Sequence, residues 1–482
     1  MTNDLCMLPV AQLVELFRSG VASPVDATLS ALARVDALNP ALNAFQHLDR
    51  ELSLEAARAS ERRWHDGTPL SDLDGVPITI KDTVETKNMP TRFGSASIGA
   101  EGPWLHDAPL SERLRKAGTV LLGKTTSPEF GWKGATDSPL YGVTRNPWNA
   151  ERTPGGSSGG AAASVAVGMG TLAVGTDAAG SVRLPASFTG IFTLKPTFAR
   201  IPLYPPSSQG SLSHAGPMTR CVDDAARMMN VMARPDLRDW NNVPFDAEDY
   251  RALLGQDIGG MRINVSRTLG FVDESTVAPA IYDALDRAAS VFESLGAIIT
   301  RDEPDLQGHH PGAIMNVHWQ SNVALLVAGI PERLHGRMDP GLFRCAAAGS
   351  AIDAATVLRA HQDRARLAVI FNEFQSRYDL LLTPTMPCTA LPLYHAAAGG
   401  GDGVDIGWTP FTLTFNLTKQ PAASIPFGFD PDGLPIGLQL VGAVFDDARV
   451  LQAAKAFETA IGGFPMPAMG IFNVPSPQGL NT

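Results

Sequence analysis

The sequence predicts an α/β fold in which a large mixed β-sheet is covered by helices on both faces. Short apolar runs rich in β-branched residues, at 76–80 and 119–123, are typical of buried strands. Helix-like stretches at 280–295 and 354–377 lie between such runs, with Pro279 suited to the start of the first. Strands that alternate with helices in this way favour the α/β class.

The first 70 residues are expected to form helices that wrap the core. Residues 8–20 repeat apolar side chains at the spacing of one helix face. Ser23, followed by Pro24 and then by Asp26 three positions after the serine, resembles a capping box that starts a second helix.

The C-terminal part adds strands to the same sheet. Residues 378–382 form a third apolar run, and 423–429 with 437–441 flank a turn-rich Asp-Pro-Asp-Gly, which indicates a hairpin. The glycine-rich stretch 396–407 is interpreted as a flexible surface loop.

We find no linker that would divide the chain, so a single domain over 1–482 is expected. Within it, 71–230 is the expected catalytic core segment, 231–350 a variable region of weak periodicity, and 351–482 the C-terminal part of the sheet.

Composition excludes several classes of function. The chain has 482 residues, 44% of them hydrophobic, and a net charge of −11. Without a basic field, binding to nucleic acid or to an anionic membrane is not expected. No HExxH or clustered His/Asp/Glu set predicts a metal site, and no cofactor is expected.

A cytoplasmic location is expected. The four cysteines (Cys6, Cys221, Cys345 and Cys388) are scattered, which suits a reducing compartment. The N-terminus lacks the basic region of a signal peptide. The longest weakly polar run, 159–174, is too short for a bilayer and is interpreted as a packed core helix.

Two glycine- and serine-rich segments are candidates for chemistry. Residues 155–160 run into a helix-like stretch, and hydroxyls at the start of a helix could meet an anion or a reacting centre. Alternatively, this segment could be a flexible linker. Residues 175–183 end a small-residue turn in Ser181; converging N–H groups could form an oxyanion hole, or Ser181 could simply cap the turn.

Lys81 ends an apolar strand. Most lysines are solvated, but one that ends a buried strand is a candidate for desolvation, which lowers its pKa and makes the neutral amine available as a base.

Together these segments resemble the amidase signature family, whose members hydrolyse carboxamides with a Ser–cis-Ser–Lys triad. The resemblance is carried by the lysine segment 75–82, the central segment 155–160 and the nucleophile segment 175–183. Two later stretches, 379–384 and 416–439, agree with it. The resemblance implies the amidase signature fold and hydrolysis of a linear amide C–N bond.

The resemblance also implies a role for each site residue. Ser181 would be the nucleophile, Ser157 the cis-serine that relays its proton, and Lys81 the base. The remaining implied roles are an oxyanion hole from the N–H groups of Ala178, Ala179, Gly180 and Ser181, a supporting shell of Ser158, Asp177 and Arg183, and substrate contacts at Gly156 and Thr176. Ser158 is expected to orient Lys81, and Asp177 to pair with Arg183.

Two positions depart from the family pattern: Ala179 replaces a common glycine, and Lys419 stands where glycine is common. The expected partner is a small amide, with a homodimer as the commonest assembly of such enzymes. Pocket walls are expected from 130–137, from His318 and Trp319, from the middle region and from the loop near 400.

Three alternatives remain. An α/β-hydrolase would use Ser158 at the centre of a G-x-S-x-G motif, but no histidine stands in a recognisable context. The glutamine-hydrolysing (A-type) component of a tRNA transamidation complex would share the triad, although residues 203–213 do not resemble that component. The same triad could also cleave carbamates or esters.

Overall fold

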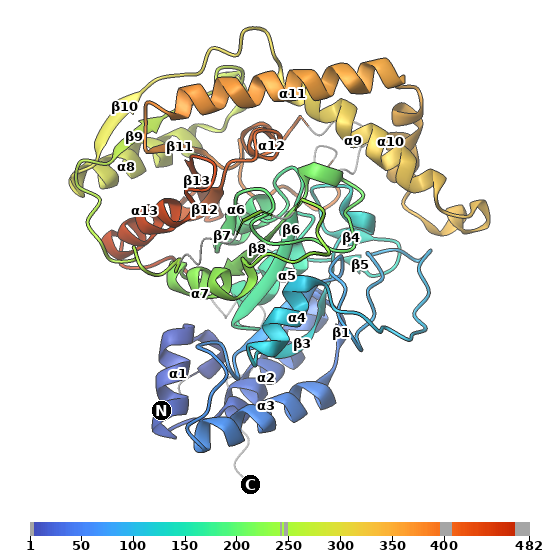
Figure 1. Ribbon diagram of the computed structural model, residues 1–482, viewed down its shortest axis with the longest axis vertical. Helices are drawn as coiled ribbons and strands as arrows, with labels where there is room; N and C mark the ends of the chain where they lie inside the picture. Colours follow the sequence, from blue (N-terminus) through green and yellow to red (C-terminus); the bar gives the residue numbers. More distant parts are fainter. Residues whose placement is uncertain (1–3, 242, 245–248, 396–406, 468–482) are drawn as a thin grey trace.

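A single eleven-stranded sheet forms the centre of the molecule (Figure 1). The computed structural model describes residues 4–241, 243–244, 249–395 and 407–467. In spatial order the strands are β1 (Phe45–Leu48), β3 (Val120–Thr125), β2 (Pro77–Lys81), β6 (Leu172–Asp177), β8 (His214–Thr219), β7 (Phe192–Lys195), β12 (Ala422–Phe429), β13 (Pro435–Gly442), β11 (Leu380–Pro384), β9 (Arg262–Val265) and β10 (Ile298–Arg301).

The sheet is mixed, as the sequence predicts. β2 runs parallel to both β3 and β6, and β9 runs parallel to β10 and β11. The pairs from β6 through β8, β7, β12 and β13 to β11 are antiparallel. A separate two-stranded ribbon consists of β4 (Asp137–Ser138) and β5 (Gly142–Val143).

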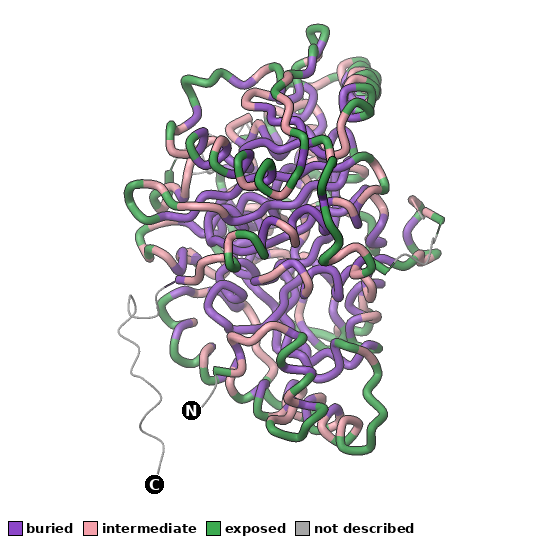
Figure 2. The backbone as a smooth tube through the Cα atoms, turned by 90° about the vertical axis from the view of Figure 1, so that its left-hand side faces the viewer, coloured by how far each residue is buried: buried purple, intermediate pink, exposed green. Residues whose placement is uncertain are grey.

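Helices flank this sheet. They are α1 (Val10–Ser19), α2 (Pro24–Leu42), α3 (Arg50–His65), α4 (Pro109–Lys116), α5 (Gly159–Ala166), α6 (Arg183–Thr189), α7 (Val222–Met232), α8 (Pro279–Ser294), α9 (Pro311–Ala328), α10 (Pro340–Ser350), α11 (Ala354–Gln375), α12 (Pro410–Leu417) and α13 (Asp447–Ala460). The short 3-10 helices of the described residues are η1 (Leu5–Met7), η2 (Glu129–Gly131), η3 (Gly210–Leu212), η4 (Glu274–Thr276) and η5 (Glu332–Arg337). Buried residues gather in the interior of the molecule and exposed ones lie mostly at its periphery (Figure 2).

Several local predictions are confirmed. Ser23 and Asp26 form the capping box that starts α2. The strands at 76–80, 119–123 and 378–382 are β2, β3 and β11, and β12 and β13 form the hairpin. Within the described ranges, no single helix is long and apolar enough to span a membrane. Helices α10 and α11 together reach that length and apolar composition, but the chain bends by 95° between them.

The N-terminal segment is not wholly helical. β1 lies between α2 and α3 and pairs antiparallel with β3, so this segment contributes the edge strand of the sheet. The middle region also contributes to the sheet through β9 and β10, and it contains the long helix α9. The expected loop at 396–407 lies outside the described residues except for Gly407.

The run 159–174 is not one helix. Gly168 has a φ of +75° and ends the chain's helical course after α5, and β6 begins at Leu172. A left-handed φ is costly for residues with a side chain, so a glycine here allows the reversal from helix to strand. Because β6 carries the nucleophile segment at its end, this break positions the site.

We expect Gly168→Ala to lower the free energy of unfolding by about 3 kcal/mol, because it adds crowding to backbone strain. An added Cβ would lie 2.5 Å from Met7 Sδ and 3.1 Å from the Cys6 carbonyl oxygen. Gly67→Ala is the matched control, since Gly67 has a φ of +69° and no atom within 4 Å of an added Cβ; about 1 kcal/mol is expected there. Equal losses in urea denaturation would contradict the packing argument.

Candidate active site

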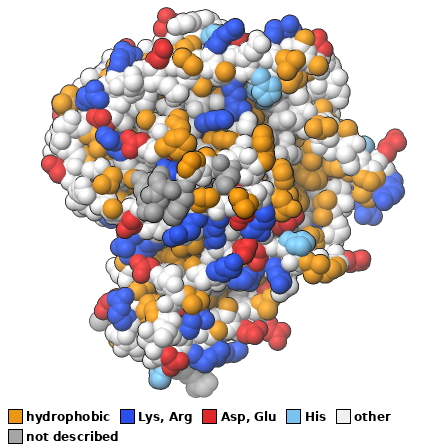
Figure 3. Space-filling view, in the orientation of Figure 1, with side chains coloured by type: hydrophobic (Ala, Val, Ile, Leu, Met, Phe, Trp, Pro, Cys, Tyr) orange, Lys and Arg blue, Asp and Glu red, His pale blue; other side chains and the backbone are white. Residues whose placement is uncertain are grey.

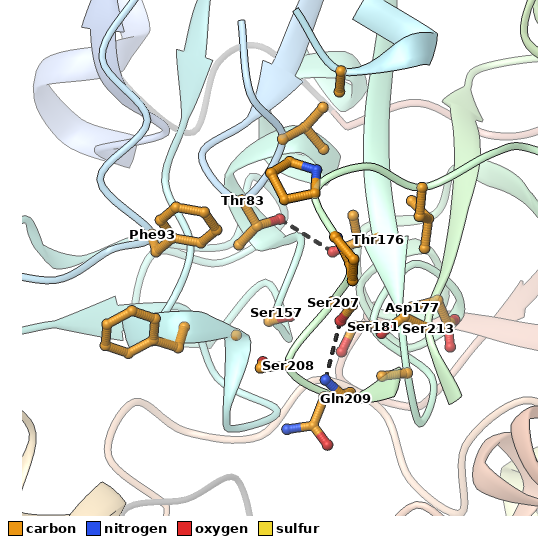
Figure 4. Close-up of a pocket in the computed structure, with 18 of the residues that line it drawn as sticks. Thr83, Phe93, Ser157, Thr176, Asp177, Ser181, Ser207, Ser208, Gln209 and Ser213 are labelled. Atoms are coloured by element: carbon orange, nitrogen blue, oxygen red, sulfur yellow. Dashed lines mark hydrogen bonds between the residues drawn. The ribbon is translucent and has the colours of Figure 1, made fainter. Parts of the chain in front are cut away.

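The candidate site lies where two parallel strands end side by side. Lys81 is the last residue of β2 and Asp177 the last residue of β6. Because β2 and β6 are parallel neighbours, their carboxyl ends share one edge of the sheet. Ser157 and Ser158 come directly before α5, and Figure 4 shows Ser157, Thr176 and Ser181 around one pocket.

Lys81 is fully buried and bonded to Ser157. Its Nζ lies 2.7 Å from Ser157 Oγ and 2.9 Å from Thr176 Oγ1. Burial lowers the pKa of Lys81 from 10.5 to about 7, while the negative charge of Asp177 opposes the decrease. A substantial fraction of this amine is therefore neutral near pH 7 and can accept a proton.

Ser157 stands in a crowded backbone. The Gly156–Ser157 peptide bond is cis, as the resemblance implied. A Cβ at Gly156 would lie 2.7 Å from the carbonyl carbon of Ala135, and a Cβ at Gly131 would lie 3.1 Å from Ser157 Oγ. Gly156 was expected to bind substrate, but it packs on Ala135 and is not among the residues that line the pocket.

The turn that carries Ser181 is organised by Asp177. Its carboxylate accepts hydrogen bonds from the N–H groups of Gly180 (2.7 Å) and Val182 (3.1 Å). Arg183 lies 3.0 Å from the same carboxylate, with both side chains fully buried, so the predicted pair is confirmed. Burial acts to raise the pKa of Asp177, but the charge and hydrogen bonds of Arg183 prevail and hold it well below the usual range.

One oxyanion prediction needs correction. The N–H of Gly180 was expected to face substrate, but it is directed at Asp177 Oδ1. The carboxylate is the stronger acceptor and it is permanently in place, so Gly180 fixes the turn. Ala178 lines the pocket beside Ser181, and the N–H groups of Ala178, Ala179 and Ser181 remain as candidate donors.

Ser157 and Ser181 line the same cavity, which has a volume of about 280 Å³. Ser158 N–H donates to the backbone oxygen of Ser181 at 3.1 Å, so the central and nucleophile segments are joined directly. Among the described residues, the structure contains no hydrogen bond between the hydroxyls of Ser157 and Ser181. Catalytic hydrogen bonds are often formed only when substrate binds.

Ser158 and Thr176 have roles that differ from the expected ones. Ser158 Oγ does not contact Lys81; it donates to the backbone oxygen of Thr176 (3.1 Å) and accepts from the Thr176 N–H (3.2 Å). Thr176, expected to touch substrate, lines the pocket but also places its hydroxyl against Lys81 and 3.2 Å from Thr83 Oγ1. Ser158 therefore acts on Lys81 through Thr176.

Only part of the pocket wall was predicted. Of 130–137, Phe130 and Gly131 line it; Trp319 does so too, whereas His318 packs against His361 with ring centroids 4.5 Å apart. Lys419 is exposed and lies over the Phe198 ring, away from the pocket. Leu326 confirms the expected contribution of the middle region. The remaining lining residues were missed: Thr83, Val84, Phe93, Ile98, Ala108, Leu110, 203–209 and Ser213.

Charged groups are dispersed elsewhere. Figure 3 shows acidic and basic side chains interspersed with apolar ones over one face of the molecule. In the described part of the chain, no group of three or more His, Cys, Asp or Glu side chains could hold a metal ion.

This geometry defines an α/β protein with a buried lysine–serine site, and comparison with known proteins identifies the family. The Amidase family profile matches residues 26–451. The chain is 36% identical to the A component of the glutamyl-tRNA(Gln) amidotransferase of Chloroflexus aggregans, over 95% of this chain and 97% of that protein. It is 35% identical to the acylamidase of Rhodococcus erythropolis, over 95% and 96%.

Solved structures agree. A bacterial aryl acylamidase of the amidase signature family superposes with a TM-score of 0.85 at 29% identity, covering 94% of this chain and 96% of that one. A 6-aminohexanoate cyclic dimer hydrolase gives a TM-score of 0.84 at 28% identity, covering 94% and 97%. The chain belongs to the amidase signature family.

The pH dependence of activity tests the Lys81 assignment. If Lys81 is the base, the active form carries a neutral amine, so kcat/KM for an uncharged amide should fall about tenfold per pH unit below 7 and level off above it. Lys81→Arg, which stays charged, should lose orders of magnitude at every pH. A flat profile from pH 5 to 9 would contradict the assignment.

Thr176→Val tests the positioning of Lys81. Loss of the hydroxyl acceptor disfavours the charged amine, so the midpoint of the kcat/KM profile should move to lower pH and the plateau should fall. Thr83→Val is the control, because the Thr83 hydroxyl contacts Thr176 and not Lys81. An unmoved midpoint in Thr176→Val would refute this role.

Proposed function

We propose that this chain is an amidase that hydrolyses the C–N bond of linear carboxamides through an acyl-enzyme on Ser181, releasing a carboxylic acid and ammonia or an amine. The observation that carries the proposal is the 2.7 Å contact between the buried Lys81 Nζ and Ser157 Oγ. The depressed pKa of Lys81, about 7, supplies a base at neutral pH.

The proposed reaction begins when neutral Lys81 takes the proton of Ser157, which takes the proton of Ser181. Ser181 Oγ attacks the carbonyl carbon, and the N–H groups of Ala178, Ala179 and Ser181 stabilise the oxyanion. Protonated Lys81 then returns its proton through Ser157 to the leaving nitrogen as the C–N bond breaks. Water, activated by the same relay, attacks the acyl-enzyme and releases the acid.

The relatives support this reaction class. One of the similar proteins is named an acylamidase and one of the similar structures an aryl acylamidase. Ester or carbamate cleavage by the same residues is an alternative, because an acyl-enzyme on Ser181 would form in each case.

The four cysteines are free, which supports the proposed reducing, cytoplasmic compartment.

A second candidate is the glutamine-hydrolysing component of a tRNA transamidation complex. The 36% identity to such a component, over 95% of the chain, favours it. A purified single chain that hydrolyses simple amides without a partner would support the free-standing amidase. Activity that depends on added partner proteins would support the complex.

Active-site labelling tests the nucleophile. A fluorophosphonate should modify Ser181, as located by peptide mass spectrometry, and Ser181→Ala should abolish both labelling and amide hydrolysis. Ser157→Ala should lower kcat by several orders of magnitude through loss of the relay. Ser208→Ala, at an exposed serine of the same pocket, is the control for labelling; labelling at a serine other than Ser181 would overturn the assignment.

A further inference from the structure

The described part of the pocket wall offers no free charge to a substrate. Among its described lining residues one side chain is charged, Asp177, and that carboxylate is occupied by Arg183 and two backbone N–H groups. Most of the others are apolar or carry hydroxyls. A charged group buried here would have no counterion, which is costly. The wall therefore disfavours an amino acid such as glutamine, which carries both charges.

An aromatic pair forms one side of the pocket. The rings of Phe93 and Phe130 stack with centroids 6.1 Å apart and planes inclined by 24°. Both residues have left-handed backbones, with φ of 53° and 51°, and the Phe130 N–H donates to the Phe93 carbonyl oxygen at 2.6 Å. Left-handed angles are rare for bulky residues and gather at functional positions, where surrounding structure enforces them.

Buried carboxylates hold the backbone of this pair in place. Asp82 accepts hydrogen bonds from the N–H groups on either side of Phe93, those of Arg92 (2.9 Å) and Gly94 (2.8 Å). Next to Phe130, the fully buried Glu129 accepts from Ser95 Oγ and from the Asp339 N–H at 2.6 Å. The rings are therefore presented by a rigid backbone, which lowers the entropy lost when a flat ligand packs on them.

The aromatic pair lies on the leaving-group side of the reaction. Gly131, which follows Phe130, is close enough to Ser157 that a Cβ there would be 3.1 Å from its hydroxyl. Ser157 is the proposed proton donor to the leaving nitrogen, so a substituent on that nitrogen extends toward these rings. Figure 4 shows Ser157 between Phe93 and Ser181 in that view. The segment 203–213 instead leads into β8 and ends beside Asp177, because His214, the first residue of β8, is the strand partner of Asp177 in β6.

We infer that the substrate is an uncharged amide whose leaving amine carries an aromatic ring, an anilide, with that ring packed on Phe93 and Phe130. This inference rests on the proposed amide hydrolysis and adds the substrate class and two specificity-determining residues.

The test compares kcat/KM for acetanilide, acetamide, 3-phenylpropanamide and glutamine. Wild type should prefer acetanilide, and Phe93→Leu and Phe130→Leu should lower the acetanilide-to-acetamide ratio about five- to tenfold. Leucine keeps an apolar side chain and removes the ring face. Phe445→Leu is the matched control, since Phe445 also has a left-handed backbone (φ 72°) but lies outside the pocket; its ratio should equal that of wild type.

Two kinetic results would overturn the inference. One is a ratio that falls for 3-phenylpropanamide, whose ring is on the acyl side, but not for acetanilide. The other is glutamine as the preferred substrate, which would leave amide hydrolysis standing. Calorimetric titration of Ser181→Ala separates the two proposals further. If Ser181→Ala binds acetanilide but not glutamine, and wild type cleaves no amide, the proposed function is wrong and the pocket assignment stands. If Ser181→Ala does not bind acetanilide, the pocket assignment is wrong.

Discussion

The burial of one amine is the constraint on which the rest of the site depends. Holding the pKa of Lys81 near 7 instead of 10.5 costs on the order of 5 kcal/mol of folding free energy at neutral pH. The amine stays out of water because β2 is buried along its whole length, between β3 and β6. A shorter or more exposed strand would let water reach the amine and return it to a charged group.

A second constraint limits how far this pKa falls. The charge of Asp177 acts to raise the pKa of Lys81, and Arg183 offsets much of that charge by pairing with the carboxylate. Arg183 also donates to Asn416 Oδ1 (2.6 Å) and to Gln439 Oε1 (2.7 Å). The nucleophile turn is thus fixed by α12 and β13, which gives a physical reason why late stretches of the chain carry the family resemblance.

The sequence was most informative where one local signal decides the structure. The apolar run that stops at Lys81 predicted β2 and the buried amine, and Ser23 with Asp26 predicted the start of α2. The break at Gly168 was missed, because small apolar residues suit a core helix as well as a buried strand. Its left-handed φ becomes visible only in the structure.

The pocket could not be predicted in the same way, because tertiary contacts create it. Phe93 sits in an irregular connection after β2, and only its packing on Phe130 makes it a wall. The family resemblance implied a substrate contact for Thr176, yet strand pairing turns its hydroxyl toward Lys81. The sequence offered one signal for this wall: Phe93 and Phe130 each stand beside a glycine, and Phe130 also stands beside Glu129. Such neighbours are too common to identify a pocket.

The site depends on a Lys81 amine that loses its proton near neutral pH, and a direct titration tests this. Protein labelled with 13C at the lysine ε-carbons can be followed by NMR from pH 5 to 11, with the Lys81 signal assigned by its loss in Lys81→Met. The account predicts a midpoint near 7. A Lys81 signal that titrates near 10, with the solvated lysines, would contradict it.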